Sequence, residues 1–166
     1  MSRAGAQHVL FALAQYFHQK SYLVQAAFVY DKDGLAAEWQ SGYPFPVLNL
    51  SNSRRRPGVF RLLRIVWRLW RLLREHDFEI VHTLTPHANL IGLPLAWLAG
   101  VRVRVASHHG IIGNTTRLFD WAHGRLINSW IVQTQVVVSQ AVAQWTVEHE
   151  KVRRDKIVEI PNGIEP

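Results

Sequence analysis

Short apolar runs typical of strands alternate with helix-like segments along almost the whole chain. Apolar residues recur at helical spacing in segments 6–19, 57–76, 86–100, 117–131 and 140–150. Strand-like runs occupy 21–30, 45–50, 78–82, 101–107, 135–139 and 157–160. Alternation of this kind predicts a mainly parallel sheet with helices on both faces. We therefore expect an α/β fold of the doubly wound type.

Two features refine this expectation. The run "VRVRV" (101–105) alternates strictly, whereas a strand buried on both faces reads as a continuous apolar run, so we expect it at a sheet edge or with one wet face. Doubly wound domains usually open with a strand, but this chain begins a few residues before a helix. We therefore expect the first strand of the fold to be missing.

Composition narrows the class of protein. A chain of 166 residues is expected to form one domain with a sizeable core. It has no cysteine, which excludes disulfides and thiolate metal sites. No apolar run reaches the roughly 18 residues of a membrane span, and the start lacks the order of a signal peptide. We expect a cytoplasmic protein.

Positive charge is concentrated in one region. The net charge is +7, and eight of the fifteen arginines lie between Arg54 and Arg74. Such a patch suggests an anionic partner: phosphate, nucleic acid or lipid headgroups. The chain lacks aromatic stacking motifs of RNA-binding modules, so we expect no nucleic acid partner.

The segment 61–75 predicts a basic amphipathic helix. One stripe carries Arg61, Arg64, Arg68 and Arg71, and the other side carries Leu62, Leu63, Val66, Leu69, Trp70 and Leu73. Together with Arg54, Arg55 and Arg56 the arginines form a candidate anion or membrane patch. We expect the apolar side of this helix to pack in the core. Two interpretations of the arginines stay open: they attract lipid phosphates, or they are only solvated.

Polar residues gather where predicted strands end, which is where open α/β sheets bind ligands. They are His82, Thr83, Ser107, His108, His109, Gly110 and Ser139. Adjacent side chains diverge, so we expect one of the two neighbouring histidines to face a site and no metal to be chelated by the pair. Ser139 is first of all a helix N-cap candidate. The small turn at Ala4 and Gly5 lies before a helix, where free N–H groups attract phosphate, although a plain turn explains it equally.

The order of these motifs resembles the N-terminal half of a family-4 glycosyltransferase. The resemblance is carried by "AGAQH", "FEIVHTLTPHANLIG", "LAGVRVRVASHHG", "QVVVSQAV" and "RRDKIVEIPNGIEP". Members are GT-B enzymes with two Rossmann-like domains facing each other across a cleft. The resemblance implies a Rossmann-like N-terminal domain at 1–160 and the start of an interdomain linker at 161–166. A C-terminal nucleotide-sugar domain is expected to be absent from this chain.

The resemblance also implies roles for individual residues. Ala4, Gly5 and Ser139 would lie near the donor diphosphate, His109 near the reacting sugar as the catalytic residue, and His82, His108 and Gly110 in the acceptor cleft. Transfer in the family typically retains anomeric configuration and needs no metal or other cofactor. The chain departs from the family at Ala4, where glycine is usual, and at Gln7, where an acid is commoner.

Two functions remain in competition at this stage. The first is the acceptor-binding half of an enzyme that transfers a sugar from a nucleotide-sugar donor to a lipid-linked or cell-envelope glycan, peripheral on the inner face of the membrane. Its partners would be the donor, the acceptor and an anionic membrane surface. The alternative is a non-catalytic module of the same origin that docks on membranes or on a separate donor-domain chain.

Overall fold

The computed structural model describes residues 5–29, 31, 34–51, 58–110 and 115–161. The chain divides into two compact units, Met1–Leu72 and Leu73–Pro166. Every paired strand in the described part is parallel to its neighbour, and helices flank the strands, which confirms the predicted α/β fold. The site predictions at Ala4, Arg54, Arg55 and Arg56 lie outside the described residues.

The first unit is built on two parallel strands. Its elements are α1 (Gly5–Gln19), β1 (Ala26–Phe28), α2 (Leu35–Gln40), β2 (Val47–Asn49) and most of α3 (Val59–Glu75). Strand β1 pairs with β2 in the register Ala26↔Val47, and α1 and α2 pack against these strands. Both strands are shorter than the segments predicted from sequence.

Aromatic rings fill the core of the first unit. Phe11 of α1 lies 3.5 Å from Trp39 of α2 and 6.2 Å from Phe28 of β1, measured between ring centroids. Helix α2 was not predicted from the sequence. The buried carboxylate of Asp31 accepts a hydrogen bond of 3.0 Å from the N–H of Ala36, which satisfies a free donor at the start of this short helix.

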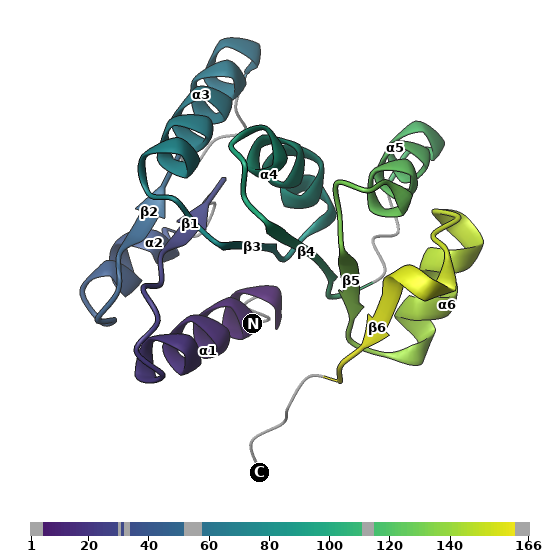
Figure 1. Cartoon of the computed structure of the whole chain (residues 1–166), viewed down its shortest axis with the longest axis horizontal. Coiled ribbons are helices and arrows are strands. Elements are labelled where there is room, and N and C mark those ends of the chain that lie inside the picture. Colours follow the sequence, from purple (N-terminus) through teal and green to yellow (C-terminus); the bar gives the residue numbers. More distant parts are fainter. Residues whose placement is uncertain (1–4, 30, 32–33, 52–57, 111–114, 162–166) are drawn as a thin grey trace. The chain divides into compact units, whose positions relative to one another are not determined.

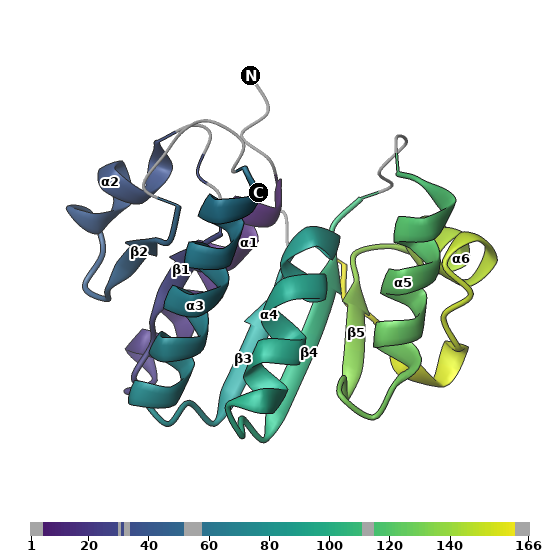
Figure 2. The ribbon, with the colours of Figure 1, turned by 90° about the horizontal axis from the view of Figure 1, so that it is seen from above.

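The second unit is a four-stranded sheet with helices between successive strands (Figure 1). Its elements are β3 (Ile80–Thr83), α4 (Pro86–Leu98), β4 (Val103–His108), α5 (Arg117–Asn128), β5 (Thr134–Val137), α6 (Gln140–His149), a 3₁₀ turn η1 (Arg154–Lys156) and β6 (Ile157–Glu159). The strand order is β3-β4-β5-β6. Helix α4 packs against β3 and β4, as Figure 2 shows, and α6 against β5 and β6.

Hydroxyl side chains cap all three helices of this sheet. Thr85, Thr116 and Ser139 each accept a hydrogen bond from the N–H three residues ahead, at 3.3, 3.2 and 3.3 Å. Each cap satisfies one N–H group that the helix itself leaves without a partner. These caps place the starts of α4, α5 and α6 at the carboxyl ends of β3, β4 and β5.

The prediction that "VRVRV" lies at a sheet edge is wrong. Strand β4 pairs with β3 on one side and with β5 on the other. Arg104 is 7% exposed, and its guanidinium donates hydrogen bonds to the carbonyls of Val101, Arg102 and Ile131. The alternation therefore reflects an arginine that is buried among backbone carbonyls at the start of the strand, between the exposed Val103 and the partly exposed Val105.

The strand register decides which side chains share a face of the four-stranded sheet. His82 lies opposite Val105, and Ala106 lies opposite Gln135. Because side chains alternate along a strand, Ser107 shares a face with His82, whereas His108 shares the other face with Ala106. Ala106 packs in a core that includes Leu93, Ile127, Val132 and Val152.

Candidate functional site

The carboxyl ends of β3 and β4 bring two polar side chains together. The Nε2 atom of His82 and the Oγ atom of Ser107 share a hydrogen bond of 2.7 Å. The pKa of His82 is lowered to about 4, mainly because its ring is buried and also because of charge on His109. The imidazole of His82 is therefore uncharged at neutral pH.

His109 follows directly after β4, and its ring is half-buried. Both of its ring nitrogens are shielded from solvent and have no hydrogen-bond partner among the described residues. Burial lowers the pKa of His109, and charge on His108 lowers it further. A neutral ring of this kind offers one N–H donor and one acceptor nitrogen to a ligand. Because these hydrogen bonds are unmade, the ring would gain from a bound polar group.

His108 is the last residue of β4, and its side chain is buried inside the unit. It is 1% exposed, and its Nε2 atom lies 3.6 Å from Oε1 of Glu150. Its ring packs 5.6 Å from that of Trp145 and 6.0 Å from that of His123. His108 is therefore enclosed by helices α5 and α6, whereas His109 is only half-buried.

Three residues that the sequence analysis did not select complete this interior cluster. They are Asn89 of α4, His123 of α5 and Glu150 at the end of α6, all at most 2% exposed. The Nδ1 atom of His123 lies 2.9 Å from Oε1 of Glu150. These residues could not be selected from the sequence, because they lie 34 and 27 residues apart along the chain and no local pattern connects them.

The amide of Asn89 joins the cluster to strand β3. Its nitrogen donates to the carbonyls of Thr83 and Thr85 at 3.2 and 3.0 Å, and its oxygen accepts from Nε2 of His123 at 2.9 Å. The opposite orientation would point the amide oxygen at those two carbonyls, which is unfavourable. The other ring nitrogen of His123, Nδ1, lies 2.9 Å from Oε1 of Glu150, so the ring stands between the amide and the carboxylate.

The remaining predicted site residues differ in how available they are. Ser139 caps α6, so its hydroxyl is occupied by the N–H of Val142. Gly110 is half-buried, and a Cβ added there would meet no atom within 4 Å. Gly5 opens α1 in the first unit and also has open space around its Cα. No group of histidine, aspartate and glutamate in the described part of the chain is arranged to hold a metal ion.

The arginine stripe of α3 differs from the prediction. Ile65, Leu69 and Leu73 form the buried side of the helix. Leu62, Leu63 and Trp70, which were expected in the core, are instead exposed by 38, 60 and 41%.

The exposed side of α3 therefore carries aromatic as well as basic residues. Phe60 and Trp67 lie there with Arg64, and the guanidinium of Arg71 lies 5.6 Å from the centre of the Trp67 ring. Arg68 is partly buried and donates to the carbonyl of Leu50 at 3.2 Å, whereas Arg61 is exposed. No helix in the described ranges is long and apolar enough to cross a membrane.

Comparison with known proteins gives a consistent result. The family model for Glycosyltransferase Family 4 matches residues 3–166. The crystal structure of Anabaena Alr3699/HepE in complex with UDP matches with a TM-score of 0.78 and 18% identity, covering 99% of this chain and 42% of that chain. A glycosyltransferase from Rickettsia africae ESF-5 matches with a TM-score of 0.74 and 20% identity, covering 99% and 41%. No curated protein matches significantly. The chain thus spans less than half the length of either solved protein.

Proposed function

This chain belongs to glycosyltransferase family 4, and from that premise we propose that it is the acceptor-side half of a sugar transferase. The enzyme would move a sugar from a nucleotide-sugar donor to a glycan acceptor, and the donor-binding half would be a second GT-B domain following a linker at 161–166. Two GT-B relatives of which the chain covers about two fifths support this division. The UDP in the Anabaena protein supports a nucleotide-sugar donor.

The observation that carries this proposal is the state of His109. It lies at the carboxyl edge of a parallel sheet, where α/β folds bind ligands, with two nitrogens that no described residue satisfies. Its lowered pKa keeps the ring neutral, so it can accept a hydrogen bond or a proton from a sugar hydroxyl. His82, bonded to Ser107, provides a second neutral imidazole at this edge.

The family resemblance also implies contacts with the donor. Ala4 and Gly5 would approach the donor diphosphate, and the amides at the start of α6, next to Ser139, would add partial positive charge. Charge that develops on the departing diphosphate would be met by such helix starts. We propose retention of anomeric configuration without a metal ion, as the family resemblance implies.

We further propose that the acceptor is a lipid-linked or cell-envelope glycan and that α3 holds the protein on an anionic bilayer at the cytoplasmic face. Exposed tryptophan and phenylalanine favour the headgroup region, and arginine attracts lipid phosphate. Phe60, Leu63 and Trp67 with Arg64 and Arg71 present both kinds of residue on one side of a helix. Binding would then combine electrostatic attraction with shallow insertion of the aromatic rings.

The experiment that tests the enzyme assignment compares two proteins. One is the 166-residue chain alone, and the other is the same chain followed by a GT-B donor domain. Both are incubated with labelled nucleotide sugars and a membrane lipid extract. We expect label in the lipid fraction only from the two-domain protein, because the chain alone does not position donor against acceptor, which can contribute about 7–11 kcal/mol to lowering the barrier.

The same assay distinguishes the enzyme from the competing function, a docking module without catalysis. Such a module would bind vesicles in both forms and transfer no sugar in either. Turnover by the single domain would contradict the proposed division of labour. A donor domain that binds UDP in the fusion yet gives no transfer to any acceptor in the extract would contradict the enzyme assignment.

A further inference from the structure

A carboxylate is buried beneath the sheet edge that carries His109. Glu150, directly after α6, is 2% exposed and is contacted by His123 at 2.9 Å and by His108 at 3.6 Å. Burial raises the pKa of Glu150, but hydrogen bonds and charge from the two histidines outweigh this, so that its pKa lies below the ordinary value. Glu150 is therefore ionised, and a buried carboxylate persists only where such partners compensate it.

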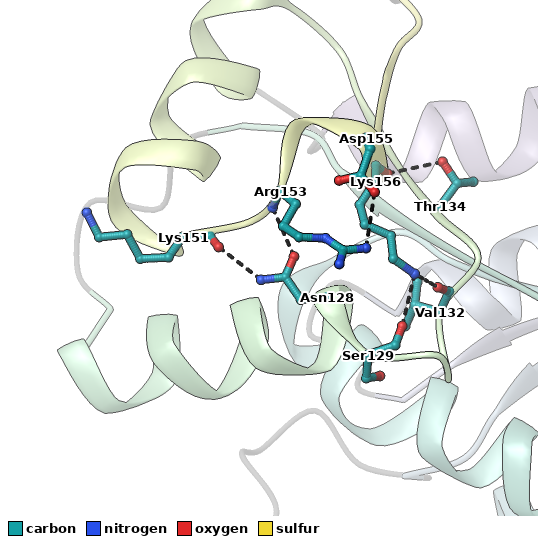
Figure 3. Close-up of polar contacts among 8 residues, drawn as sticks. All are labelled: Asn128, Ser129, Val132, Thr134, Lys151, Arg153, Asp155 and Lys156. Carbon is teal, nitrogen blue, oxygen red and sulfur yellow. Dashed lines mark hydrogen bonds and ion pairs between the residues drawn. The ribbon is translucent and has the colours of Figure 1, made fainter.

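The backbone around Glu150 is held in place from α5. A Cβ added to Gly124 would lie 1.7 Å from the carbonyl oxygen of Glu150, so the two backbones touch. Figure 3 shows Asn128, one turn further along α5, donating to the carbonyl of Lys151 and accepting from the N–H of Arg153, both at 2.9 Å. Glu150 therefore has little freedom to follow its partners if they move.

The contacts of Glu150 restrain His109 through one residue, His108. His108 is the last residue of β4, and its ring is held between Glu150 and Trp145 on the helix-covered face. His109 comes next, directly after the strand. Fixing the ring of His108 fixes the end of the strand and hence the direction in which His109 leaves it.

We propose that Glu150 is a positioning residue that acts through His108 to hold the ring of His109 in place at the edge of the sheet. The importance of this for catalysis rests on the proposed transferase function, but the mechanical link does not. Glu150 reaches the site from helix α6, far along the sequence from His109, and does not itself touch a substrate. His123 and, through it, Asn89 hold the carboxylate from the other side.

The test uses the 166-residue chain labelled with ¹⁵N-histidine, and NMR follows the titration of each ring. The His109 signal is assigned by its loss in His109→Gln. Glu150→Gln keeps the size of the side chain and removes its charge. The matched control is Glu148→Gln, an exposed glutamate on the same helix that accepts from Gln144 at 2.9 Å.

We expect Glu150→Gln to raise the pKa of His109 toward 6.5, its ordinary value, and Glu148→Gln to leave it unchanged. The reason is the burial that mainly lowers this pKa: a strand end that is no longer held lets water reach the His109 ring.

A merely structural role gives a different result. The melting temperature would fall in Glu150→Gln while the His109 titration in the folded protein stayed at its wild-type position, and this would overturn the proposal. If Glu150→Gln does not fold, Glu150→Asp keeps the charge on a shorter side chain, and it must shift His109 in the same direction by a smaller amount. An unchanged titration in folded Glu150→Asp would equally overturn it. Neither outcome depends on whether sugar transfer is observed.

Discussion

Gly124 is the described glycine at which an added methyl group should lower the free energy of unfolding most. In Gly124→Ala the new Cβ would lie 1.7 Å from the oxygen and 2.8 Å from the carbonyl carbon of Glu150. Ordinary contacts between such atoms are about 3.5 Å or longer, so α5 and the end of α6 must separate by about 1.5 Å or more. Both groups are backbone, which has no rotamer with which to avoid the clash.

The cost follows from what that separation breaks. The contact of 2.9 Å between His123 and Glu150 would be lost, and taking a partner from a buried charge costs about 3–5 kcal/mol. Alanine is a better helix former than glycine by about 1 kcal/mol, which offsets part of the loss. We therefore expect Gly124→Ala to lower the free energy of unfolding by about 2–4 kcal/mol.

The assay is urea unfolding followed by circular dichroism, with Gly5→Ala as the control. Gly5 also lies in a helix, but a Cβ there meets nothing within 4 Å, so its substitution should change stability by no more than about 0.5 kcal/mol. If Gly124→Ala is as stable as Gly5→Ala, the close approach of α5 to Glu150 does not exist and the positioning proposal loses its support.

Three further predictions can be checked on the same chain. The free energy of unfolding should fall by up to about 3 kcal/mol between pH 6.5 and 4, because the unfolded chain binds a proton that folded His82 does not, and His82→Gln should flatten this slope in urea unfolding at each pH. Ser139→Ala should lower stability by about 1 kcal/mol by removing the cap of α6, measured in the same way. In co-sedimentation, Arg64→Gln should weaken binding to anionic vesicles about fivefold at low salt, whereas Trp67→Ala should weaken it at high salt too; binding that neither change affects would mean that α3 does not contact lipid.

The fold was predictable because its signals are local. Apolar periodicity over a few residues identified five of the helices. Short apolar runs identified all six strands of the described residues, although β1 and β2 proved shorter than predicted. Helix α2 was missed because it has only six residues, and its start is stabilised by Asp31, which precedes it by several residues.

The errors in the prediction arise from tertiary contacts. The segment "VRVRV" was expected at a sheet edge or with one wet face, but it lies between two strands, and backbone carbonyls at the strand start surround Arg104. On α3 the helical spacing correctly predicted an apolar and a basic side. It could not determine how wide the buried side is, and Leu63 and Trp70 lie outside it.

The candidate site was predictable only in part. Parallel strands place their carboxyl ends together, which is why His82, Ser107 and His109 could be selected from sequence. The contacts of His108 with Glu150 and of His123 with Asn89 join residues more than thirty positions apart. Such pairs leave no periodic trace in a single sequence, so the interior role of His108 became apparent only from the structure.

The central claim is that His109 takes part in sugar transfer, and the turnover of the two-domain enzyme tests it most directly. His109→Ala should lower kcat by about ten- to a hundredfold, because a hydrogen bond to a charged or charge-developing group contributes about 1.5–3 kcal/mol. The matched change is His76→Ala, an exposed histidine after α3 that lies outside the candidate site, and it should reduce kcat far less. Wild-type kcat in folded His109→Ala would contradict the account.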